Sequence, residues 1–138
     1  MGVNILEQSL EIAHSILPDA CSQRKKNKVF HFAFGYRRSK LLAMGQNNPE
    51  KTNAKALRLS QRFNTNIKYP YLHAETDLIS RLWGKYYIDK NLSLVVIRLN
   101  KNGELRNSKP CKRCNKILKA LDITKVWWSI EDGFNKQA

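Results

Sequence analysis

The donor groups of a metal site stand in two short segments that are far apart in the sequence, 71–75 and 110–114. The first segment carries His73, and the second carries Cys111 and Cys114. One imidazole and two thiols match the three protein ligands of a catalytic zinc, which keeps its fourth tetrahedral position for water. We expect these three side chains to bind one zinc ion, and the chain must then fold so that the two segments meet.

Glu75 follows His73 by two residues, near the expected start of a helix. At this spacing its carboxylate can lie beside the water on the metal without being a ligand, which is the position of a proton shuttle. Two thiolates cancel the charge of the zinc, so the site acidifies its water less than three neutral histidines would. Both segments are expected to open helices, whose N-terminal ends stabilise thiolate, and Pro110 suits the first turn of the second helix.

The order of these residues is H-x-E at 73–75 followed by P-C-x-x-C at 110–114. This pattern resembles that of the zinc-dependent cytidine deaminase superfamily, and the chain is similar to small phage and bacterial deaminases of nucleic-acid cytosine. The resemblance implies an α/β fold in three α/β/α layers, with a central mixed sheet of four to five strands, formed by residues 1–138 as a single domain. It also implies hydrolytic conversion of cytosine to uracil, with Glu75 as the catalytic residue that moves the proton.

The resemblance further implies contacts with the substrate. The G-x-N sequence at 45–47 implies that Asn47 hydrogen-bonds the sugar of the substrate. The alternative is that this segment only forms a turn, because Asn-Asn-Pro is a common turn sequence. Backbone groups near Ala74 and Lys109 are expected to hold the edge of the base. The loop 129–134 resembles in position a loop that reads neighbouring nucleotides. Two aromatic side chains that flank Pro70 are candidates for stacking on the base: Tyr69 and Tyr71.

Hydrophobic periodicity predicts the rest of the scaffold. The spacing predicts a helix over 4–17 that ends before Pro18, and strands over 29–36 and 40–44. An apolar stripe over 78–86 predicts that Trp83 belongs to the core. The remaining expected elements are a helix over 73–83, a strand over 92–99, a helix over 110–121 and a strand over 125–130. A fifth strand after Ile130 is expected to be minimal or absent.

The charge of the chain is its main compositional feature, with 25 Lys and Arg against 11 Asp and Glu and a net charge of +14. Such an excess favours a polyanion partner, because neutralising phosphates releases counterions. We expect nucleic acid, DNA more than RNA; a membrane surface is the runner-up, and a merely solubilising charge is the plainest alternative. The candidate phosphate contacts lie on an expected helix over 54–63 and in the link between the first two strands: Lys55, Arg58, Arg62, Arg37 and Arg38.

Other functions share the same ligands. A deaminase of free cytidine or deoxycytidylate would need a small closed pocket and no comparable basic excess, and a tRNA adenosine deaminase would use the same residues. A nucleic-acid-binding protein with a structural zinc would need a fourth ligand, which His14, His31 and Cys21 are poorly placed to supply. No apolar run is long enough to cross a bilayer and no secretion signal opens the chain, so a cytoplasmic location is expected.

Overall fold

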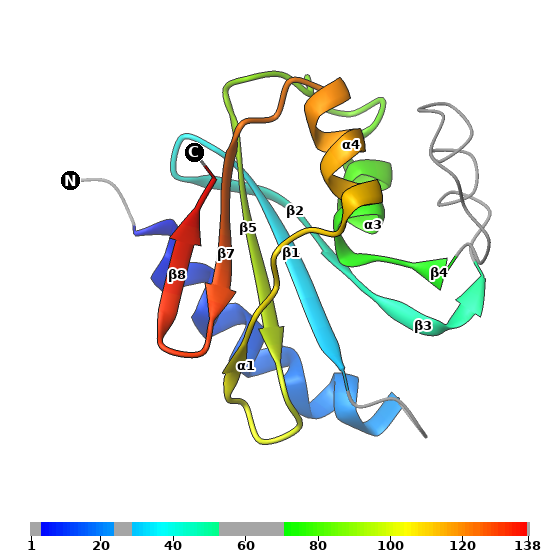
Figure 1. Cartoon of the computed structure of the whole chain (residues 1–138), viewed down its shortest axis with the longest axis vertical. Coiled ribbons are helices and arrows are strands. Elements are labelled where there is room, and N and C mark those ends of the chain that lie inside the picture. Colours follow the sequence, from blue (N-terminus) through cyan, green and yellow to red (C-terminus); the bar gives the residue numbers. More distant parts are fainter. Residues whose placement is uncertain (1–3, 24–28, 53–70, 138) are drawn as a thin grey trace.

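The computed structural model describes residues 4–23, 29–52 and 71–137, and for residues 48–52, 71 and 72 it describes the backbone alone. Within these ranges, helices cover both faces of a central sheet (Figure 1). This is the three-layer α/β/α arrangement that the sequence predicts. No helix in the described part of the chain has the length and apolarity needed to span a bilayer.

The central sheet has six strands and is mixed. Its strands run in the order β2-β1-β5-β7-β8, and β6 pairs with β5 at its end. Strands β5 and β7 are parallel, and the other pairs are antiparallel. The strand bounds are β1 Phe30–Arg37, β2 Lys40–Gln46, β5 Leu92–Leu99, β6 Leu105–Arg106, β7 Lys125–Ile130 and β8 Gly133–Lys136. A separate two-stranded sheet pairs β3 (Asn48–Thr52) with β4 (Tyr71–Leu72).

Helix α1 (Ile5–Gln23) packs on one face of the sheet. Alternate side chains of β1 and β5 point to it, and they are buried in one cluster with Ala13, Leu17 and Ala20: Phe30, Phe32, Phe34, Tyr36, Val95, Ile97 and Leu99. The helix passes through Pro18 and does not end before it, so the predicted boundary is wrong. Ala20, two residues beyond the proline, is buried at 5% exposure, so the apolar face of the helix continues past Pro18.

Helices α3 (Ala74–Leu82) and α4 (Lys112–Ala120) cover the opposite face. The core on this side contains Leu78, Ile79 and Leu82 of α3 together with the other set of alternating strand residues. The stripe predicted from Leu78 to Tyr86 is right only within the helix, because α3 ends at Leu82 and leaves Trp83 42% exposed. Pro110 precedes Cys111, the N-cap of α4, and therefore lies outside the first turn in which it was expected.

The C-terminal part of the described chain forms a tight hairpin. Residues Ser129 and Ile130 complete β7, and the chain turns directly into β8, with Ile130 paired to Gly133. The expected reading loop over 129–134 is thus mostly strand. A short fifth strand is present on the main path of the sheet, in agreement with the minimal one that the sequence allowed.

Helix α3 lies very close to β2 at Gly45. A Cβ atom on Gly45 would lie 2.4 Å from the Ala74 carbonyl oxygen and 2.5 Å from the Leu78 backbone nitrogen. Real carbon atoms do not approach backbone atoms so closely, so only glycine lets the first turn of α3 rest against this strand. Gly45 therefore helps set the position of the turn that carries Glu75.

Replacing Gly45 with alanine is expected to destabilise the fold by about 1–3 kcal/mol, since the backbone of α3 must move away from β2. Urea denaturation followed by circular dichroism measures the change. The matched control is Gly35→Ala in β1, whose added Cβ would meet only the ends of two leucine side chains, at 3.3 Å from Leu78 Cδ1 and 3.4 Å from Leu82 Cδ1. Equal losses for both variants would contradict a special role for the contact at Gly45.

Candidate metal centre and active site

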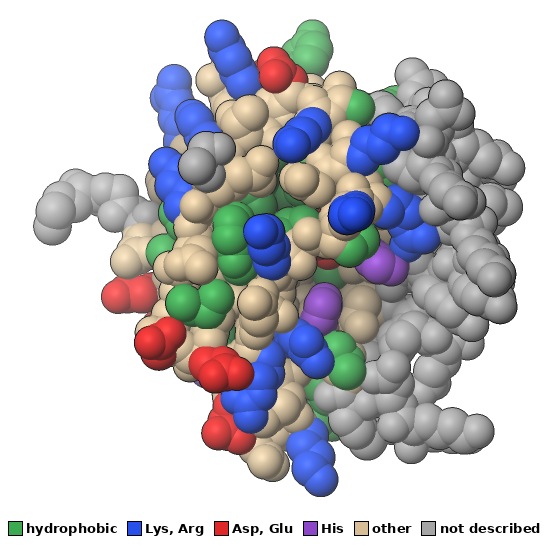
Figure 2. All heavy atoms as spheres, viewed as in Figure 1, with side chains coloured by type: hydrophobic (Ala, Val, Ile, Leu, Met, Phe, Trp, Pro, Cys, Tyr) green, Lys and Arg blue, Asp and Glu red, His purple; other side chains and the backbone are tan. Residues whose placement is uncertain are grey.

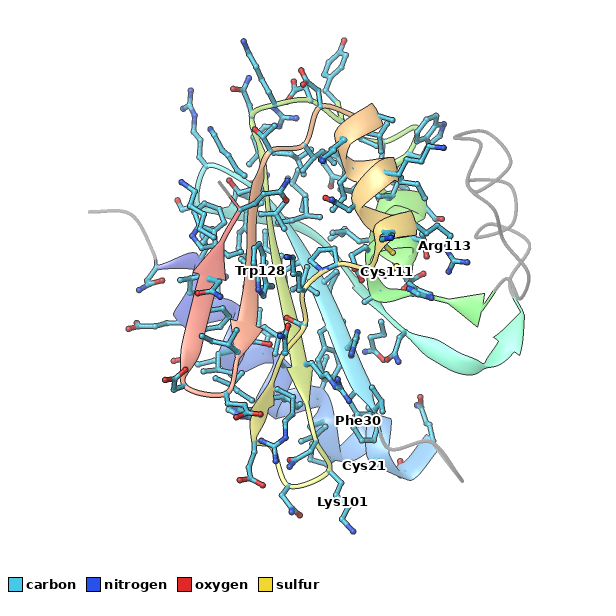
Figure 3. All side chains as sticks on the ribbon, viewed as in Figure 1. Cys21, Phe30, Lys101, Cys111, Arg113 and Trp128 are labelled. Atoms are coloured by element: carbon cyan, nitrogen blue, oxygen red, sulfur yellow. The ribbon has the colours of Figure 1, made fainter. Side chains whose placement is uncertain are left out.

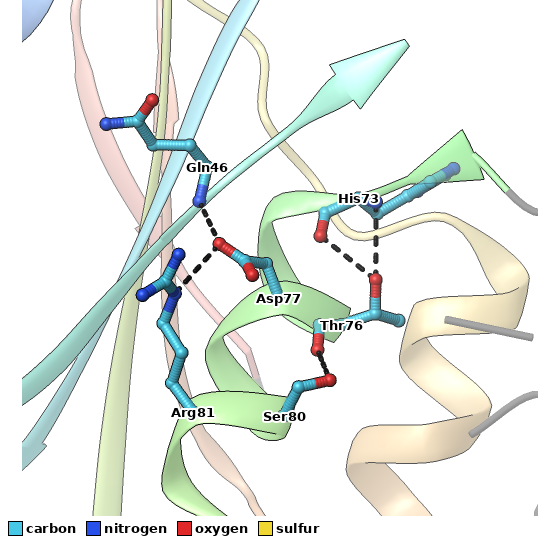
Figure 4. A network of polar contacts seen from close by, with 6 residues as sticks. All are labelled: Gln46, His73, Thr76, Asp77, Ser80 and Arg81. Atoms are coloured by element: carbon cyan, nitrogen blue, oxygen red, sulfur yellow. Dashed lines mark hydrogen bonds and ion pairs between the residues drawn. The ribbon is translucent and has the colours of Figure 1, made fainter. Parts of the chain in front are cut away.

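His73 is the N-cap of α3, where the backbone is extended before the helix begins. The Thr76 hydroxyl accepts a hydrogen bond from the His73 backbone N–H at 3.2 Å and donates one to the His73 carbonyl at 2.9 Å (Figure 4). These two bonds satisfy a helix-end donor that has no intrahelical partner. They also fix the backbone from which the imidazole extends.

Cys111 and Cys114 belong to the start of α4, next to Arg113 (Figure 3). Cys111 is the N-cap, and its sulfur accepts a hydrogen bond from the Cys114 backbone N–H at 3.4 Å. Cys111 is exposed, while Cys114 is buried at 1% exposure. One sulfur thus faces the outside of the site and the other faces the core.

The three side chains form one cluster, in which the ligand atoms lie within 4.8 Å of one another. The His73 Nδ1 atom is 3.8 Å from the Cys111 sulfur and 3.5 Å from the Cys114 sulfur. A tetrahedral zinc, with bonds of about 2.3 Å to sulfur and about 2.0 Å to nitrogen, would hold these atoms roughly 3.6 Å apart. The donor set and its dimensions therefore fit the zinc ion that the sequence predicts, and the distances point to Nδ1 as the histidine ligand atom.

The Glu75 carboxyl is buried beside this cluster, at 4% exposure. Burial raises its pKa, and the nearby Cys111 charge acts in the same direction. Hydrogen bonds to its own backbone and to Cys114, together with the charge of His73, oppose that rise. Glu75 is thus held next to the cluster through Cys114 without belonging to the set of metal ligands.

The two thiols differ strongly in acidity. The pKa of Cys111 falls to about 3, first because it accepts a hydrogen bond from Cys114, with further support from His73. The pKa of Cys114 rises, because of this same hydrogen bond, its burial and the charges of Glu75 and Cys111. The positive charge of Arg113 opposes the rise at Cys114. The metal-free site therefore holds one thiolate in advance, and the second sulfur gives up its proton when metal binds.

In the metal-free protein, alkylation of Cys111 by iodoacetamide is expected to vary little between about pH 5 and pH 8, because its thiolate is already formed. An ordinary thiol would instead react about tenfold faster per pH unit in this range. Mass spectrometry of a Cys21→Ser background measures the rate, and saturating zinc should protect the residue. An ordinary pH profile at Cys111 would contradict this ionisation.

A buried pair of serines positions the segment before Cys111. Ser108 Oγ donates to the Val96 carbonyl at 2.7 Å and accepts from the Ser129 backbone N–H at 2.8 Å. Ser129 Oγ in turn accepts from the Arg98 backbone N–H at 3.0 Å and donates to the Arg106 carbonyl at 2.7 Å. The pair ties the segment leading to α4 to β5 and β7, so the sheet determines where Cys111 lies.

Replacing Ser108 with alanine is expected to destabilise the fold by about 1–3 kcal/mol, because the buried Ser129 N–H loses its acceptor. The same change should also weaken zinc binding, because Ser108 helps fix the segment that leads to Cys111. Denaturation and competition with a chromophoric chelator measure the two effects. Ser80→Ala is the control, since its hydroxyl bonds only within α3, to the Thr76 carbonyl; unchanged zinc affinity in Ser108→Ala would contradict the positioning role.

Sequence reasoning missed the residues that support the ligands. Thr76 had a signal, because it stands at the third helical position after an N-cap, where a side chain reaches back to the cap. Asp77 joins β2 to α3, since its Oδ2 accepts from the Gln46 backbone N–H at 3.0 Å and from Arg81 Nε at 3.1 Å (Figure 4). Ser108 and Ser129 had no signal in the sequence, because their partners are distant along the chain.

The expected substrate contacts are placed as follows. The Asn47 amide binds the backbone of the start of β1, accepting from the His31 N–H at 3.0 Å and donating to the Val29 carbonyl at 3.2 Å. Ala74 is buried in the first turn of α3, and Lys109 is exposed with its ammonium 5.8 Å from the centre of the Trp128 ring. The side chain of Tyr71 lies outside the described residues, as do Tyr69, Lys55, Arg58 and Arg62 in full.

Arg37 and Arg38 stand at the turn between β1 and β2. The guanidinium of Arg37 is 3.4 Å from the Asp89 carboxylate and donates to the Tyr87 carbonyl. Arg38 is exposed and has a φ of 58° in the turn. This turn lies at the end of the sheet opposite the metal cluster (Figure 1).

No protein-family model matches the sequence, and no curated protein matches it at a significant level. The structure is similar to the crystal structure of cytidine deaminase from Mycobacterium leprae, with a TM-score of 0.53 and 21% identity over 92% of this chain and 88% of that chain. It is also similar to the apo form of dCMP deaminase from the cyanophage S-TIM5, with a TM-score of 0.57 and 22% identity over 93% of this chain and 84% of that chain. The chain therefore has the cytidine deaminase-like fold, and it carries a His/Cys/Cys cluster that fits a zinc ion.

Proposed function

We propose that this protein is a zinc-dependent hydrolytic deaminase that converts cytosine to uracil in nucleic acid, with DNA favoured over RNA. The observation that carries the proposal is the Glu75 carboxyl, which is buried beside the His73, Cys111 and Cys114 cluster and is not part of it. A structural zinc site has no need for a buried acid there, whereas hydrolysis needs a group that moves protons. The fold shared with cytidine and dCMP deaminases supports the same reaction class.

The chain's own residues can perform the proton transfers. His73 Nδ1 and the two sulfurs would hold zinc, which when bound lowers the pKa of water and polarises it for attack. Glu75 takes a proton from the attacking water, delivers it to ring N3, and assists the departure of the amine as ammonia. Cytosine and water thereby become uracil and ammonia. Burial, which raises the pKa of the Glu75 carboxyl, suits a group that must both accept and release a proton.

The net charge of +14 supports a polymeric substrate. Nucleic-acid phosphates attract such a surface independently of sequence, whereas one nucleotide offers few phosphates. A cytosine within a strand would have to be unpaired or turned out of the stack to reach Glu75.

A deaminase of free cytidine or deoxycytidylate is the second candidate. The names of the two structural neighbours favour it, since one is a cytidine deaminase and the other a dCMP deaminase. Its substrate would require the same ligands and the same Glu75. The two candidates differ in whether the basic surface contributes to substrate binding.

The test compares deamination of single-stranded DNA, duplex DNA, RNA, deoxycytidylate and cytidine at equal cytosine concentration, with products measured by mass spectrometry. The proposal predicts turnover of a polymer, most of all single-stranded DNA, that falls steeply as salt is raised. Turnover confined to the monomers would establish the second candidate. Absence of turnover on every substrate by zinc-loaded protein would overturn the assignment as a cytosine deaminase.

A further inference from the structure

The large hydrophobic side chains that are exposed in the described part of the chain all follow α3. They are Trp83 at 42%, Tyr86 at 43% and Tyr87 at 85% exposure. Single exposed hydrophobic residues are ordinary, but three within five residues concentrate exposed aromatic surface on one connection, which we call the aromatic patch. The segment that holds them connects α3 to β5, at the end of α3 away from the metal cluster.

Two hollows meet at this patch. The larger, of about 920 Å³, lies between the β1–β2 turn and the beginnings of β5 and β7, and the smaller, of about 410 Å³, lies between β2 and the end of α3. Leu42 and Tyr86 line both, so the two hollows are neighbours with these side chains between them. Trp83 lines the smaller hollow. We call the two hollows together the basic aromatic groove; its aromatic and cationic residues are Trp83, Tyr86, Arg37, Arg38, Lys40, Arg81, Lys85 and Lys125.

The cations of the groove are only partly neutralised. Arg37 pairs with Asp89 and Arg81 pairs with Asp77. Among the residues that the structure describes, the other four cations of the groove form no ion pair: Arg38, Lys40, Lys85 and Lys125. Lys and Arg side chains gather over the end of the sheet that holds the β1–β2 turn, while acidic side chains lie mostly at the other end (Figure 2).

We propose that the basic aromatic groove binds single-stranded nucleic acid, with phosphates against its cations and a base stacked on Tyr86. A positively charged groove with exposed aromatic rings is the combination by which proteins hold unpaired strands without reading their sequence. The proposal extends the proposed function and rests on it in naming nucleic acid as the ligand. Binding, however, can be measured without turnover.

The groove and the metal cluster lie near opposite ends of α3. Helix α3 has nine residues, begins directly after His73 and ends before Trp83. Its length is about 14 Å, which is the span of a few nucleotides. A polymer retained in the groove would therefore be held within a few nucleotides of Glu75 while one base reacts.

A second copy of this chain is a poorer occupant. Two such surfaces facing each other would bring four unpaired cations per copy together, and like charges at an interface disfavour association. The acids that contact the lining arginines, Asp89 and Asp77, already pair with Arg37 and Arg81 of the same chain. Charge complementarity thus favours a polyanion.

The test uses fluorescence anisotropy of a labelled oligothymidine, which contains no cytosine, with zinc-loaded protein at several salt concentrations. Lys40→Glu and Lys85→Glu should each weaken binding and lower the slope of log affinity against log salt by about 0.7, the value for one contact with single-stranded phosphate. The charge-matched control is Lys101→Glu, which lies at the far end of the sheet (Figure 3). Equal effects of all three substitutions would show a diffuse charge effect and overturn the groove.

A second pair of variants tests stacking. Tyr86→Ala should weaken binding about tenfold, as expected for loss of one stacked base, whereas Tyr87→Ala should not, because Tyr87 is exposed but does not line the groove. Circular dichroism confirms folding, and sedimentation reports association. Equal affinities of Tyr86→Ala and Tyr87→Ala for oligothymidine would overturn the proposal. It would also be overturned if Lys40→Glu dissociated a dimer of the protein and left oligothymidine binding unchanged.

The outcomes separate this inference from the proposed function. Groove-dependent binding of oligothymidine without deamination of any substrate would support the groove and refute the deaminase. Deamination of free nucleotides alone, without groove-dependent binding, would establish the second candidate function and refute the groove.

Discussion

Glu75→Gln is expected to retain zinc and the fold while lowering turnover by about 10²–10⁴-fold, the usual contribution of a positioned proton-transfer group. Glutamine preserves the size of the side chain but cannot accept a proton from water. Single-turnover kinetics on the best substrate, together with metal analysis of the same sample, measure both effects. Activity within a few fold of the native protein would refute the shuttle role.

Asp77→Asn is the matched control for Glu75→Gln. Asp77 is also an acidic residue in the first turn of α3 and is also buried, but its carboxylate bonds the β2 backbone and Arg81. We expect this substitution to lower stability and to affect turnover far less than Glu75→Gln does. Similar losses of turnover in the two variants would indicate that displacement of α3, and not proton transfer, explains both.

Glu75→Gln should also change stability in a pH-dependent way in the metal-free protein. Because burial raises the folded-state pKa of Glu75, ionisation of this carboxyl opposes folding. The contribution of Glu75 to stability is therefore most favourable at low pH, where it is protonated, and this contribution is lost as pH rises through the folded-state pKa. The glutamine variant should therefore be the more stable of the two at neutral pH, and the difference should vanish in acid. Thermal unfolding across pH, with a chelator present, measures this difference.

Cys114→Ser is expected to have the second large effect, the loss of bound zinc and of all turnover that depends on it. The buried hydroxyl is a poorer ligand for zinc than thiolate, and one of only three protein ligands is removed. We expect zinc affinity to fall by more than about 100-fold, beyond the usual effect of an outer-shell change. Competition with a chromophoric chelator measures affinity, and Cys21→Ser, which removes the cysteine in α1, is the control.

Thermal unfolding provides a second measure of the same site. A ligand that binds only the folded chain stabilises it by about 4 kcal/mol at a thousandfold excess over its dissociation constant. Zinc should raise the midpoint of the native protein and of Cys21→Ser but not that of Cys114→Ser. Full zinc stoichiometry and an unchanged zinc-dependent shift in Cys114→Ser would contradict the assignment of this ligand.

The metal ligands could be predicted from sequence because the chemistry of zinc restricts which residues serve and how they are spaced. The strands could be predicted because alternation at Phe30, Phe32 and Phe34 places one set of side chains on one face. The expected helix over 73–83 agrees with α3 and its two caps, but local spacing could not show that Trp83 leaves the core. Trp83 continues the apolar stripe, but Gly84 adopts a φ of 83°, which a helix cannot continue.

The positioning of the ligands was less predictable than their identity. Gly45 was part of an expected sugar-binding motif, yet its main structural effect is to admit the backbone of α3. Ser108 and Ser129 support Cys111 through hydrogen bonds between parts of the chain that meet only in the folded sheet. Such contacts depend on tertiary structure and leave no periodic or local pattern.

The metal centre joins the start of α3 to the start of α4, and the stretch of chain between them contains β5. This strand pairs with β1 on one side and with β7 and β6 on the other. A bound ion would close that stretch into a loop and reduce the conformational freedom it gains on unfolding. Zinc at this position would thus act as a cross-link around the central strand, so that catalytic competence and resistance to unfolding would depend on the same three side chains.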